Sequence, residues 1–426
     1  MTKLAIQPKK ISGSVQVPPS KSMAHRAIIC ASLARGKSII SNIEYSKDIE
    51  ATISAMKALG TIILKHDNYL EIDGTTTFIK NQCEIDCCES GSTLRFMVPI
   101  SIICDANVHF KGEGRLGKRP LDVYYKIFDE QNISYLYREN VLDLYIRGQL
   151  HGGLFEIPGN VSSQFISGLL FALPLMDQDS KIVITSPLES KGYIDLTLQM
   201  LNQYGVYVIN KDYQELIIPG GQRYQPHDYE VEADFSQAAF YLVAGALGNQ
   251  VTLKGLNLKS KQGDKAAIDI LESMGCQLTQ KDDGYQMYPG ILNATTIDGS
   301  QCPDIIPVIA LACALSEGVS VIENIGRLRI KECDRLSATV EVINLLGGIA
   351  KEGEDSMIIE GVKHLHGASV SSYNDHRMAM MEAIASTVCD DVVVIDNKEC
   401  VKKSYPSFWE HFKMLGGALD EFELGD

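Results

Sequence analysis

The stretch from Arg329 to Arg335 combines cations and acids at a spacing that could support proton transfer to an anionic ligand. Lys331 and Arg335 are four residues apart, so their side chains would project together if the segment were helical. Glu332 lies between them, where the positive charges would favour its ionised form and burial would favour its protonated form. This opposition is expected of a proton-transfer group. On charge content alone, a solvated helix face is the commoner explanation.

Length and composition predict a globular protein with two or three domains. The chain has 426 residues, of which 45% are hydrophobic and 22% are charged, enough apolar material for a core in each domain. The formal net charge of −15 argues against a nucleic-acid partner and against an anionic membrane surface. A pocket inside an acidic protein can still be cationic, so this charge remains compatible with a small acidic substrate.

The apolar segments and the cysteines predict a soluble, cytoplasmic protein. The N-terminus lacks the apolar core of a signal peptide, and the longest apolar runs, residues 165–176 and 305–315, are too short to span a membrane. Eleven scattered cysteines fit reduced thiols better than a disulfide framework. Cys83, Cys87 and Cys88 lie close together, but no second Cys or His pair completes a zinc site, so we expect no metal.

Six copies of one unit fill the chain at intervals of roughly 70 residues. Each copy begins with an apolar stretch of helical length and continues through a β-branched run and a polar loop. A second, amphipathic helix follows and commonly stops at a glycine. This alternation predicts an α/β fold. The apolar helices start near Ser22, Gly91, Ser162, Asp234, Pro303 and Asn374.

The starts of these helices matter for function, because a helix N-terminus carries unpaired N–H groups and about half a positive charge. The polar loops add a cation in every copy: Lys47, Arg115, Lys191, Lys261, Lys331 and Lys403. If the repeats surround a common centre, these groups would line a cleft. Such a cleft would suit a ligand with several phosphate and carboxylate groups.

A glycine-rich stretch offers a competing interpretation. Residues Gly112 to Gly117, Gly-Glu-Gly-Arg-Leu-Gly, satisfy the dinucleotide-binding pattern and, taken alone, would predict an NAD-dependent oxidoreductase. The loop corresponds to five others that lack these glycines, however. Lys118, Arg119 and Pro120 also insert charge and a proline before a helix could begin. We therefore favour the repeat over the dinucleotide site.

Beyond these patterns, the chain resembles the 5-enolpyruvylshikimate-3-phosphate synthase family over essentially its whole length. The motifs that carry the resemblance occur in the family's order: residues 19–22 with Arg26, 114–115 with 119–120, 161–165, 190–195, 303–304, 331–336 and 373–380. The resemblance implies an inside-out α/β barrel fold of two similar domains, each with three βαβαββ repeats, six repeats in all. A double crossover would join them and allow closure on the substrates. The first domain would comprise residues 1–19 and 233–426, and the second residues 20–232.

The resemblance also implies transfer of the enolpyruvyl group of phosphoenolpyruvate to the 5-hydroxyl of shikimate 3-phosphate, with release of phosphate, in chorismate and aromatic amino acid biosynthesis. Asp304 would take the hydroxyl proton, and Glu332, assisted by Lys21, would protonate the methylene carbon. No cofactor is implied. Shikimate 3-phosphate would be held by Lys21, Ser22, Arg26, Ser162, Ser163, Gln164, Ser190, Asp304, Arg327 and Lys331. Phosphoenolpyruvate would be held by Lys21, Gly91, Arg115, Gln164, Arg335, Arg377 and Lys403.

Without the resemblance, Asp304 would be interpreted as a helix N-cap and Glu332 as the partner of a neighbouring lysine.

Two positions depart from the family's commonest pattern. Glu89 replaces an asparagine near the enolpyruvate, and we expect it to face away or to pair with a basic residue. Arg327 stands where some relatives have an asparagine that touches shikimate 3-phosphate, which leaves its role open. Gly91 is retained, which implies sensitivity to glyphosate, the family's inhibitor.

A sister family acting on a UDP-amino sugar shares the fold and the donor. Its members usually carry a reactive cysteine in the loop that spans Arg115 to Pro120 here, and no cysteine occurs there. UDP-N-acetylglucosamine enolpyruvyl transferase is therefore the weaker match. A non-catalytic anion-binding protein would not need both Asp304 and Glu332. The working hypothesis is a monomeric cytoplasmic enzyme that binds two small anions.

Overall fold

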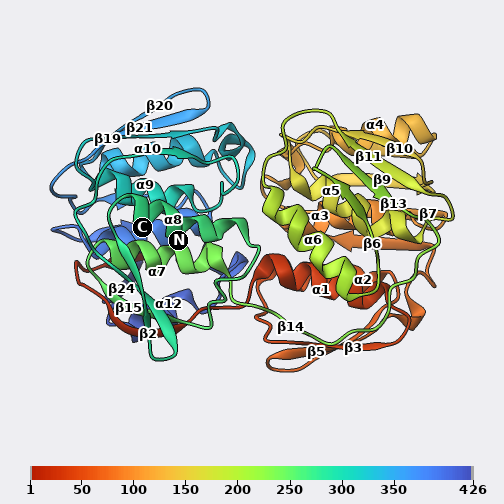
Figure 1. The fold of residues 1–426 in the computed structure, drawn as a ribbon, viewed down its shortest axis with the longest axis horizontal. Helices are drawn as coiled ribbons and strands as arrows, with labels where there is room; N and C mark the ends of the chain where they lie inside the picture. The colour runs from red at the N-terminus through yellow and green to blue at the C-terminus, as the bar shows by residue number, and fades with distance from the viewer. Residues whose placement is uncertain (1, 424–426) are drawn as a thin grey trace. The chain divides into compact units, whose positions relative to one another are not determined.

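The structure is a computed structural model that describes residues 2–423 (Figure 1). The chain forms two compact units. Unit 1 comprises Met1–Pro18 and Ala233–Asp426, and unit 2 comprises Pro19–Glu232. The chain thus leaves unit 1 early, completes unit 2, and then returns. Within the described range, no helix is both long and apolar enough to cross a membrane.

Each unit contains three four-stranded sheets with one shared topology. In one sheet, β6 (Gln82–Asp86) pairs in parallel with β7 (Ala106–Lys111), which is followed in the sheet by the antiparallel strands β9 (Asp143–Gly148) and β8 (Ser134–Tyr137). A parallel pair needs a crossover connection, and helix α3 (Gly91–Ser101) supplies it. The six predicted βαβαββ repeats are confirmed.

The remaining sheets repeat this order, and strands from both ends of a unit contribute to them. Unit 2 also contains β14 (Tyr229–Glu230), β3 (Lys37–Ser41), β5 (Tyr69–Asp73) and β4 (Ile62–Lys65), and β10 (Leu154–Ile157), β11 (Ser180–Ile184), β13 (Glu215–Ile218) and β12 (Ile209–Lys211). Unit 1 contains β22 (Ser369–Val370), β23 (Val393–Ile395), β1 (Thr2–Ile6) and β24 (Leu419–Glu423), then β16 (Gln277–Lys281), β17 (Gly284–Tyr288), β15 (Gln250–Lys254) and β2 (Ser12–Gln16), and β18 (Thr296–Asp298), β19 (Val319–Glu323), β21 (Ser356–Glu360) and β20 (Ile349–Glu352).

The helices alternate between an inner and an outer type, and the inner ones start where the sequence predicted. The inner helices are α1 (Lys21–Leu33), α3, α5 (Ser163–Ala172), α7 (Phe235–Ala246), α9 (Ile306–Ala314) and α11 (His376–Ser386). The outer helices are α2 (Lys47–Ala58), α4 (Asp122–Gln131), α6 (Lys191–Gln203), α8 (Ala266–Ser273), α10 (Arg335–Leu345) and α12 (Phe408–Met414). Short 3-10 helices are η1 (Gly74–Thr76), η2 (Leu116–Lys118), η3 (Leu173–Leu175), η4 (Gly263–Lys265), η5 (Gly326–Ile330) and η6 (Lys398–Lys403).

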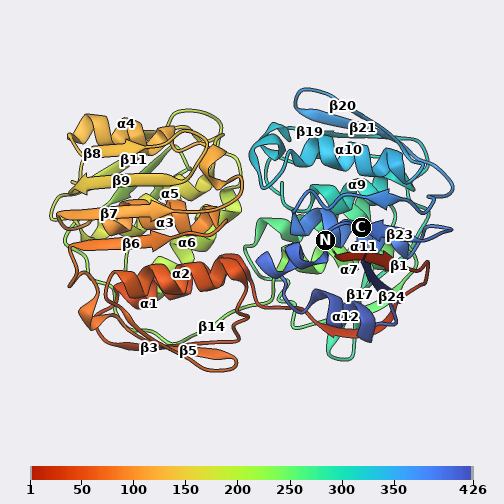
Figure 2. The same ribbon diagram turned by 180° about the vertical axis from the view of Figure 1, so that it is seen from behind.

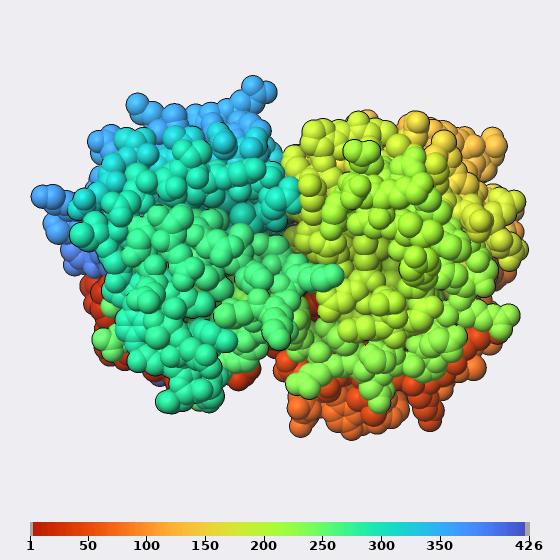
Figure 3. Space-filling model, viewed as in Figure 1, coloured from red at the N-terminus to blue at the C-terminus, as the bar shows by residue number. Residues whose placement is uncertain are grey.

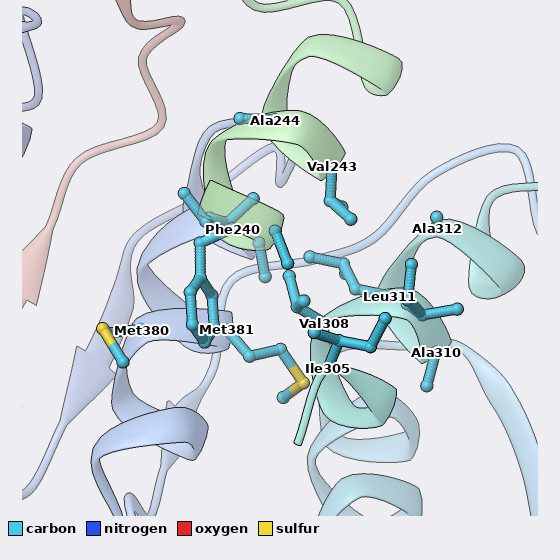
Figure 4. Packing of buried hydrophobic residues seen from close by; sticks show 14 of the residues in the cluster. Phe240, Val243, Ala244, Ile305, Val308, Ala310, Leu311, Ala312, Met380 and Met381 are labelled. Atoms are coloured by element: carbon cyan, nitrogen blue, oxygen red, sulfur yellow. The ribbon is translucent and has the colours of Figure 1, made fainter. Parts of the chain in front are cut away.

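Helices α7, α9 and α11 form the centre of unit 1. Every residue of these three helices is buried, and a helix that is buried on all sides must be enclosed by other elements. Phe240, Val308 and Met381 bring side chains of all three helices into one core (Figure 4). The sheets lie outside these helices (Figure 2), so the helices lie inside and the strands outside.

Candidate active site

Three helix starts bring charged side chains of unit 1 together. Asp304 precedes α9, Arg335 opens α10, and Arg377 lies in the first turn of α11. Asp304 Oδ1 lies 2.9 Å from Arg335 Nη1, and Asp304 Oδ2 lies 3.3 Å from Arg377 Nη2. Lys331 Nζ lies 3.3 Å from Asp304 Oδ1. Three cations therefore surround one carboxylate.

The surroundings of Asp304 keep its carboxylate ionised. Burial would raise the pKa of Asp304, but the three cations outweigh burial and hold this pKa well below its usual range. The side chain is still 18% exposed, so a ligand can reach it. The N-cap of α9 is Ile305, with no side-chain cap. The interpretation of Asp304 as a plain N-cap is therefore wrong.

Lys331 and Arg335 converge on Asp304 without sharing a helix. Residues Gly326–Ile330 form η5, Lys331 is extended with φ −85° and ψ −160°, and α10 begins only at Arg335. The helical spacing considered for this stretch is therefore wrong. The turn between the two residues, rather than a helix face, brings their side chains together. Burial lowers the pKa of Lys331 to about 8, although Asp304 opposes this shift.

Glu332 is a second carboxylate in the same cluster. Its Oε2 accepts a hydrogen bond from Arg335 Nη2 at 2.7 Å, and its Oε1 lies 3.8 Å from Lys403 Nζ. The Glu332 side chain is 13% exposed. Glu332 and Asp304 thus contact the same guanidinium, with Lys403 beside Glu332 and both Lys331 and Arg377 beside Asp304.

Asp375 holds the Arg335 guanidinium in place, a role that sequence reasoning missed. Its Oδ2 accepts a hydrogen bond from Arg335 Nε at 2.7 Å. Its Oδ1 accepts one from the backbone N–H of Arg377 at 2.9 Å, because Asp375 is the N-cap of α11. The signal that could have identified it is an aspartate directly before an inner helix.

Asp264 is another buried carboxyl group near this cluster; sequence reasoning placed it in a charged polar loop but gave it no role in the site. It lies in η4 and accepts a hydrogen bond from the hydroxyl of Ser236 at the start of α7. Burial, and then the negative charge of Asp304, raise the pKa of Asp264 to about 6. A polar residue in the loop after β15 was the only sequence signal.

The other two arginines of this stretch make different contacts. Arg329 donates to the carbonyl group of Gly353 at 2.7 Å, which ties η5 to the β20–β21 turn that projects from unit 1 (Figure 3). Arg327 Nη2 donates to the Ser300 carbonyl at 2.9 Å, and its charge contributes to the lowered pKa of Lys331. Arg329 is therefore structural, whereas Arg327 lies near the charged cluster.

In unit 2, α1 presents three of the predicted site residues at its start. Lys21 Nζ lies 2.7 Å from Asp48 Oδ2 in the first turn of α2. Arg26 is buried and donates to the carbonyl groups of Ser22 at 2.7 Å and Tyr193 at 2.9 Å. Arg26 therefore ties α1 to α6, the helix that follows Ser190.

The start of α5 contacts α3 through one side chain. Ser162 is the N-cap of α5, and Ser163 is its first residue. Gln164 Nε2 donates to Ser92 Oγ at 2.9 Å, and Gln164 Oε1 accepts from Arg95 Nη1 at 2.9 Å. The predicted ligand Gln164 is thus held in place by two residues of α3.

The guanidinium that covers Gly91 belongs to Arg119. A Cβ atom added to Gly91 would lie 2.6 Å from Arg119 Nη1. Arg115, which the motif assigned to phosphoenolpyruvate, is exposed at the N-cap of η2. Arg119 is therefore a third residue to which sequence reasoning assigned no role, although it stands in the motif with Pro120.

Two further positions are defined by their backbone surroundings. Ser190 is buried and adopts the left-handed conformation, with φ 54° and ψ 46°, directly before α6. The carboxylate of Glu89 packs against Gly114, at a place that a Cβ atom on Gly114 would occupy. Gly114 has φ 58°, a conformation that favours glycine.

The predicted residues therefore form one set in each unit. The unit 1 set meets around Asp304 and consists of Asp304, Glu332, Lys331, Arg335, Arg377 and Lys403. The unit 2 set lies at the starts of helices that pack against one another and consists of Lys21, Ser22, Arg26, Gly91, Ser162, Ser163, Gln164 and Ser190. Cations and helix N-termini suit anionic ligands, and paired carboxylates suit proton transfer.

Comparison with known proteins identifies the family. The model of the family described as EPSP synthase (3-phosphoshikimate 1-carboxyvinyltransferase) matches residues 6–412. The 3-phosphoshikimate 1-carboxyvinyltransferase of Clostridium beijerinckii is 55% identical and is aligned over 100% of both chains. That of Clostridium perfringens (strain ATCC 13124) is 56% identical over 98% of this chain and 99% of its own.

Solved structures confirm the predicted fold. EPSP synthase from Acinetobacter baumannii matches with a TM-score of 0.82 at 24% identity, covering 99% of this chain and 100% of that chain. The enolpyruvyl transferase NikO from Streptomyces tendae matches with a TM-score of 0.80 at 13% identity, covering 100% and 99%. Because the family model and the curated relatives both cover nearly the whole length, this chain belongs to the EPSP synthase (3-phosphoshikimate 1-carboxyvinyltransferase) family.

Proposed function

We propose that this enzyme transfers the enolpyruvyl group of phosphoenolpyruvate to the 5-hydroxyl of shikimate 3-phosphate, with release of phosphate, in the shikimate pathway. The unit 1 set is the observation that carries the proposal: Asp304 and Glu332 contact one guanidinium among four cations. Both substrates are anions, and the reaction must move protons at two atoms. The family membership favours this reaction over a UDP-amino-sugar transferase and over an NAD-dependent oxidoreductase at Gly112 to Gly117.

The proposed binding roles follow the charges. Shikimate 3-phosphate would be held by Lys21, Ser22, Arg26, Ser162, Ser163, Gln164, Ser190, Asp304, Arg327 and Lys331. Phosphoenolpyruvate would be held by Lys21, Gly91, Gln164, Arg335, Arg377 and Lys403, with Arg115 from the motif and Arg119 from its place over Gly91. Arginine suits these groups because its planar fork matches carboxylate and phosphate oxygens in pairs.

The chemistry would proceed by addition and elimination. Asp304 takes the proton of the 5-hydroxyl as its oxygen bonds to C2 of phosphoenolpyruvate. Glu332, assisted by Lys21, gives a proton to the methylene carbon, which becomes a methyl group. The methyl group then returns a proton to Glu332 as the bond from C2 to the phosphate oxygen breaks, and phosphate leaves with a proton equivalent to the one that Asp304 had taken, which regenerates both carboxyl groups. Fixed cations stabilise the charge that develops.

The low pKa of Asp304 applies to the enzyme without bound substrates. A base with so low a pKa accepts a proton weakly. When the anionic groups of the substrates pair with Arg377, Lys331 and Arg335, the positive field on Asp304 decreases and its pKa rises. Substrate binding would thereby activate the base at the moment when a proton must be removed.

We also propose that the enzyme acts as a monomer in the cytoplasm and needs no cofactor. The support is the chemistry of the reaction, whose electrophile is made by proton transfer, and the cysteines, all of which are free thiols among the described residues. The retained Gly91 supports sensitivity to glyphosate, which an inhibition curve tests directly.

The decisive experiment is an assay of phosphate release from phosphoenolpyruvate. We expect release that depends on shikimate 3-phosphate, with no absorbance change when a nicotinamide cofactor is added. Release that depends on a UDP-amino sugar instead would establish the sister activity. No release with either acceptor would exclude both transferase reactions.

A further inference from the structure

A hydrogen-bonded chain of buried polar side chains connects helices α1, α2 and α3 of unit 2. His25 Nδ1 lies 2.7 Å from Thr52 Oγ1. Thr52 Oγ1 lies 2.7 Å from Thr93 Oγ1, which lies 2.8 Å from Ser90 Oγ. All four residues are 0% exposed. They belong to α1, to α2 and to the start of α3, the helices visible together in Figure 2.

Counting donors gives the direction of each hydrogen bond from His25 to Ser90; the Thr93 hydroxyl also lies 3.4 Å from the Asp48 carbonyl oxygen, farther than from Ser90 Oγ at 2.8 Å. Burial lowers the pKa of His25 to about 3, so its imidazole is neutral and carries one N–H. His25 Nε2 has no hydrogen-bond partner among the described residues, and a buried donor without an acceptor is rarer than an acceptor without a donor. The proton therefore lies on Nδ1, which donates to Thr52. Thr52 in turn donates to Thr93, and Thr93 donates to Ser90.

The hydrogen-bonded chain ends at Ser90, directly before Gly91 in the first turn of α3. Ser90 is the N-cap of α3, and its Oγ accepts from the backbone N–H of Thr93 at 3.2 Å in addition to the Thr93 hydroxyl. The next residue, Gly91, lies under the guanidinium of Arg119. A shift of this turn would therefore change the distance between the Gly91 backbone and that cation.

We propose that His25, Thr52 and Thr93 are positioning residues for the enolpyruvyl donor, because their hydrogen-bonded chain fixes the turn of Gly91 beneath Arg119. The inference rests on the proposed function, in which Gly91 holds phosphoenolpyruvate. The three residues do not touch the substrate, since each is fully buried. Their loss should weaken binding of phosphoenolpyruvate while leaving shikimate 3-phosphate unaffected.

Thr93→Val tests the proposal, since it removes the central hydroxyl and keeps the shape. The KM for phosphoenolpyruvate should rise about tenfold, and that for shikimate 3-phosphate should change less than about twofold. Thr93→Ser restores the hydroxyl and should return the KM to within about threefold of the wild-type value. Ser101→Ala is the matched control, because Ser101 is also buried on α3 but bonds to the Val98 carbonyl of its own helix.

Two measurements examine the chain itself. The double variant Thr52→Val with Thr93→Val should raise the KM for phosphoenolpyruvate no further than either single variant, because one break already interrupts the chain. Nitrogen-15 NMR of the histidine side chains should show His25 as the Nδ1–H tautomer, without titration across neutral pH. An Nε2–H tautomer would contradict the assigned donor order.

The outcomes separate this inference from the proposed function. A wild-type enzyme without release that depends on shikimate 3-phosphate would refute the proposed function. If the wild type is active, an unchanged KM in Thr93→Val, an equal rise for both substrates, or full additivity in the double variant would refute the positioning chain alone. Should Thr93→Val fail to fold, Thr52→Val provides the same comparison.

Discussion

Arg335 Nε lies 2.7 Å from Asp375 Oδ2, and the two side chains are 1% and 0% exposed. Asp375→Asn should lower the free energy of unfolding by about 3 kcal/mol, because it leaves a buried charge with fewer partners. Urea denaturation measures this change. Asp390→Asn is the control, since its pair with His366 is exposed, and it should leave the midpoint unchanged. Equal midpoints for both variants would show that the buried pair has no special role in stability.

Asp304→Asn should lower kcat by about 100-fold, the usual loss when a general base is removed. Binding of both substrates should persist or strengthen, because the substitution removes a negative charge from among the cations. Steady-state kinetics and equilibrium binding measure the two effects. Asp298→Asn, in β18 just before this loop, should keep wild-type turnover. An unaltered kcat in Asp304→Asn would remove Asp304 from the role of base.

The pKa of Lys331, lowered to about 8, predicts a pH dependence. A lysine is charged below its pKa, so the cation proposed to bind shikimate 3-phosphate is lost as the pH rises past about 8. The kcat/KM for shikimate 3-phosphate should therefore fall above that pH. Lys331→Arg keeps its charge, so its profile should stay flat there. Identical alkaline limbs in both enzymes would assign the titration to another group.

Two glycine substitutions should affect different properties, substrate binding in one case and stability in the other. In Gly91→Ala, the new Cβ would meet the end of the flexible Arg119 side chain at 2.6 Å, so the guanidinium can move aside. We expect an unchanged melting temperature and a KM for phosphoenolpyruvate raised about tenfold. In Gly168→Ala, the Cβ would collide with the backbone carbonyl of Arg95, and we expect a loss of about 1–3 kcal/mol in stability. A destabilised Gly91→Ala variant would contradict this distinction.

Glu382 predicts an alkaline loss of stability. It is fully buried in α11, and neither carboxylate oxygen has a hydrogen-bond partner among residues 2–423. Burial, and then the charges of Asp396 and Asp375, raise the pKa of Glu382 well above its usual range. Native protein therefore keeps a proton that the unfolded chain releases above about pH 4.5, and stability falls with rising pH by up to about 1.4 kcal/mol per pH unit.

Glu382→Gln removes this titration and keeps the shape. Its melting temperature should exceed that of the wild type at about pH 8, and the difference should shrink toward about pH 4. A difference in melting temperature between Glu382→Gln and the wild type that stays constant over this pH range would show that Glu382 does not stay protonated in the native state.

The inner helices could be predicted because their signals are local. An apolar run of helical length marks each helix, and a short polar side chain marks its start, as Ser90 does for α3 and Asp234 for α7. Six such signals at one spacing determine the repeat, and the repeat determines the six sheets. Family motifs then supplied most of the side chains that meet around Asp304.

The partners of the charges could not be predicted, because they depend on contacts between distant residues. Asp375 pairs with Arg335, 40 positions away. The sequence around either residue contains no signal that identifies the other as its partner. Arg115 and Arg119 share one loop, and the 3-10 turn of η2 between them determines which side chain faces Gly91. The helical spacing of Lys331 and Arg335 gave a wrong prediction for the same reason, because the segment between them is not helical and α10 begins only at Arg335.

The strand β1 at Thr2–Ile6 pairs with β23 and β24, which lie at the other end of the chain. During synthesis on the ribosome, all strands of unit 2 have been made once β14 is complete. β1 has no neighbour in its sheet until about 390 further residues have followed it. The first of the described strands to be translated is therefore among the last to pair, and a chain that stalls before β23 would leave β1 as an unpaired edge open to aggregation.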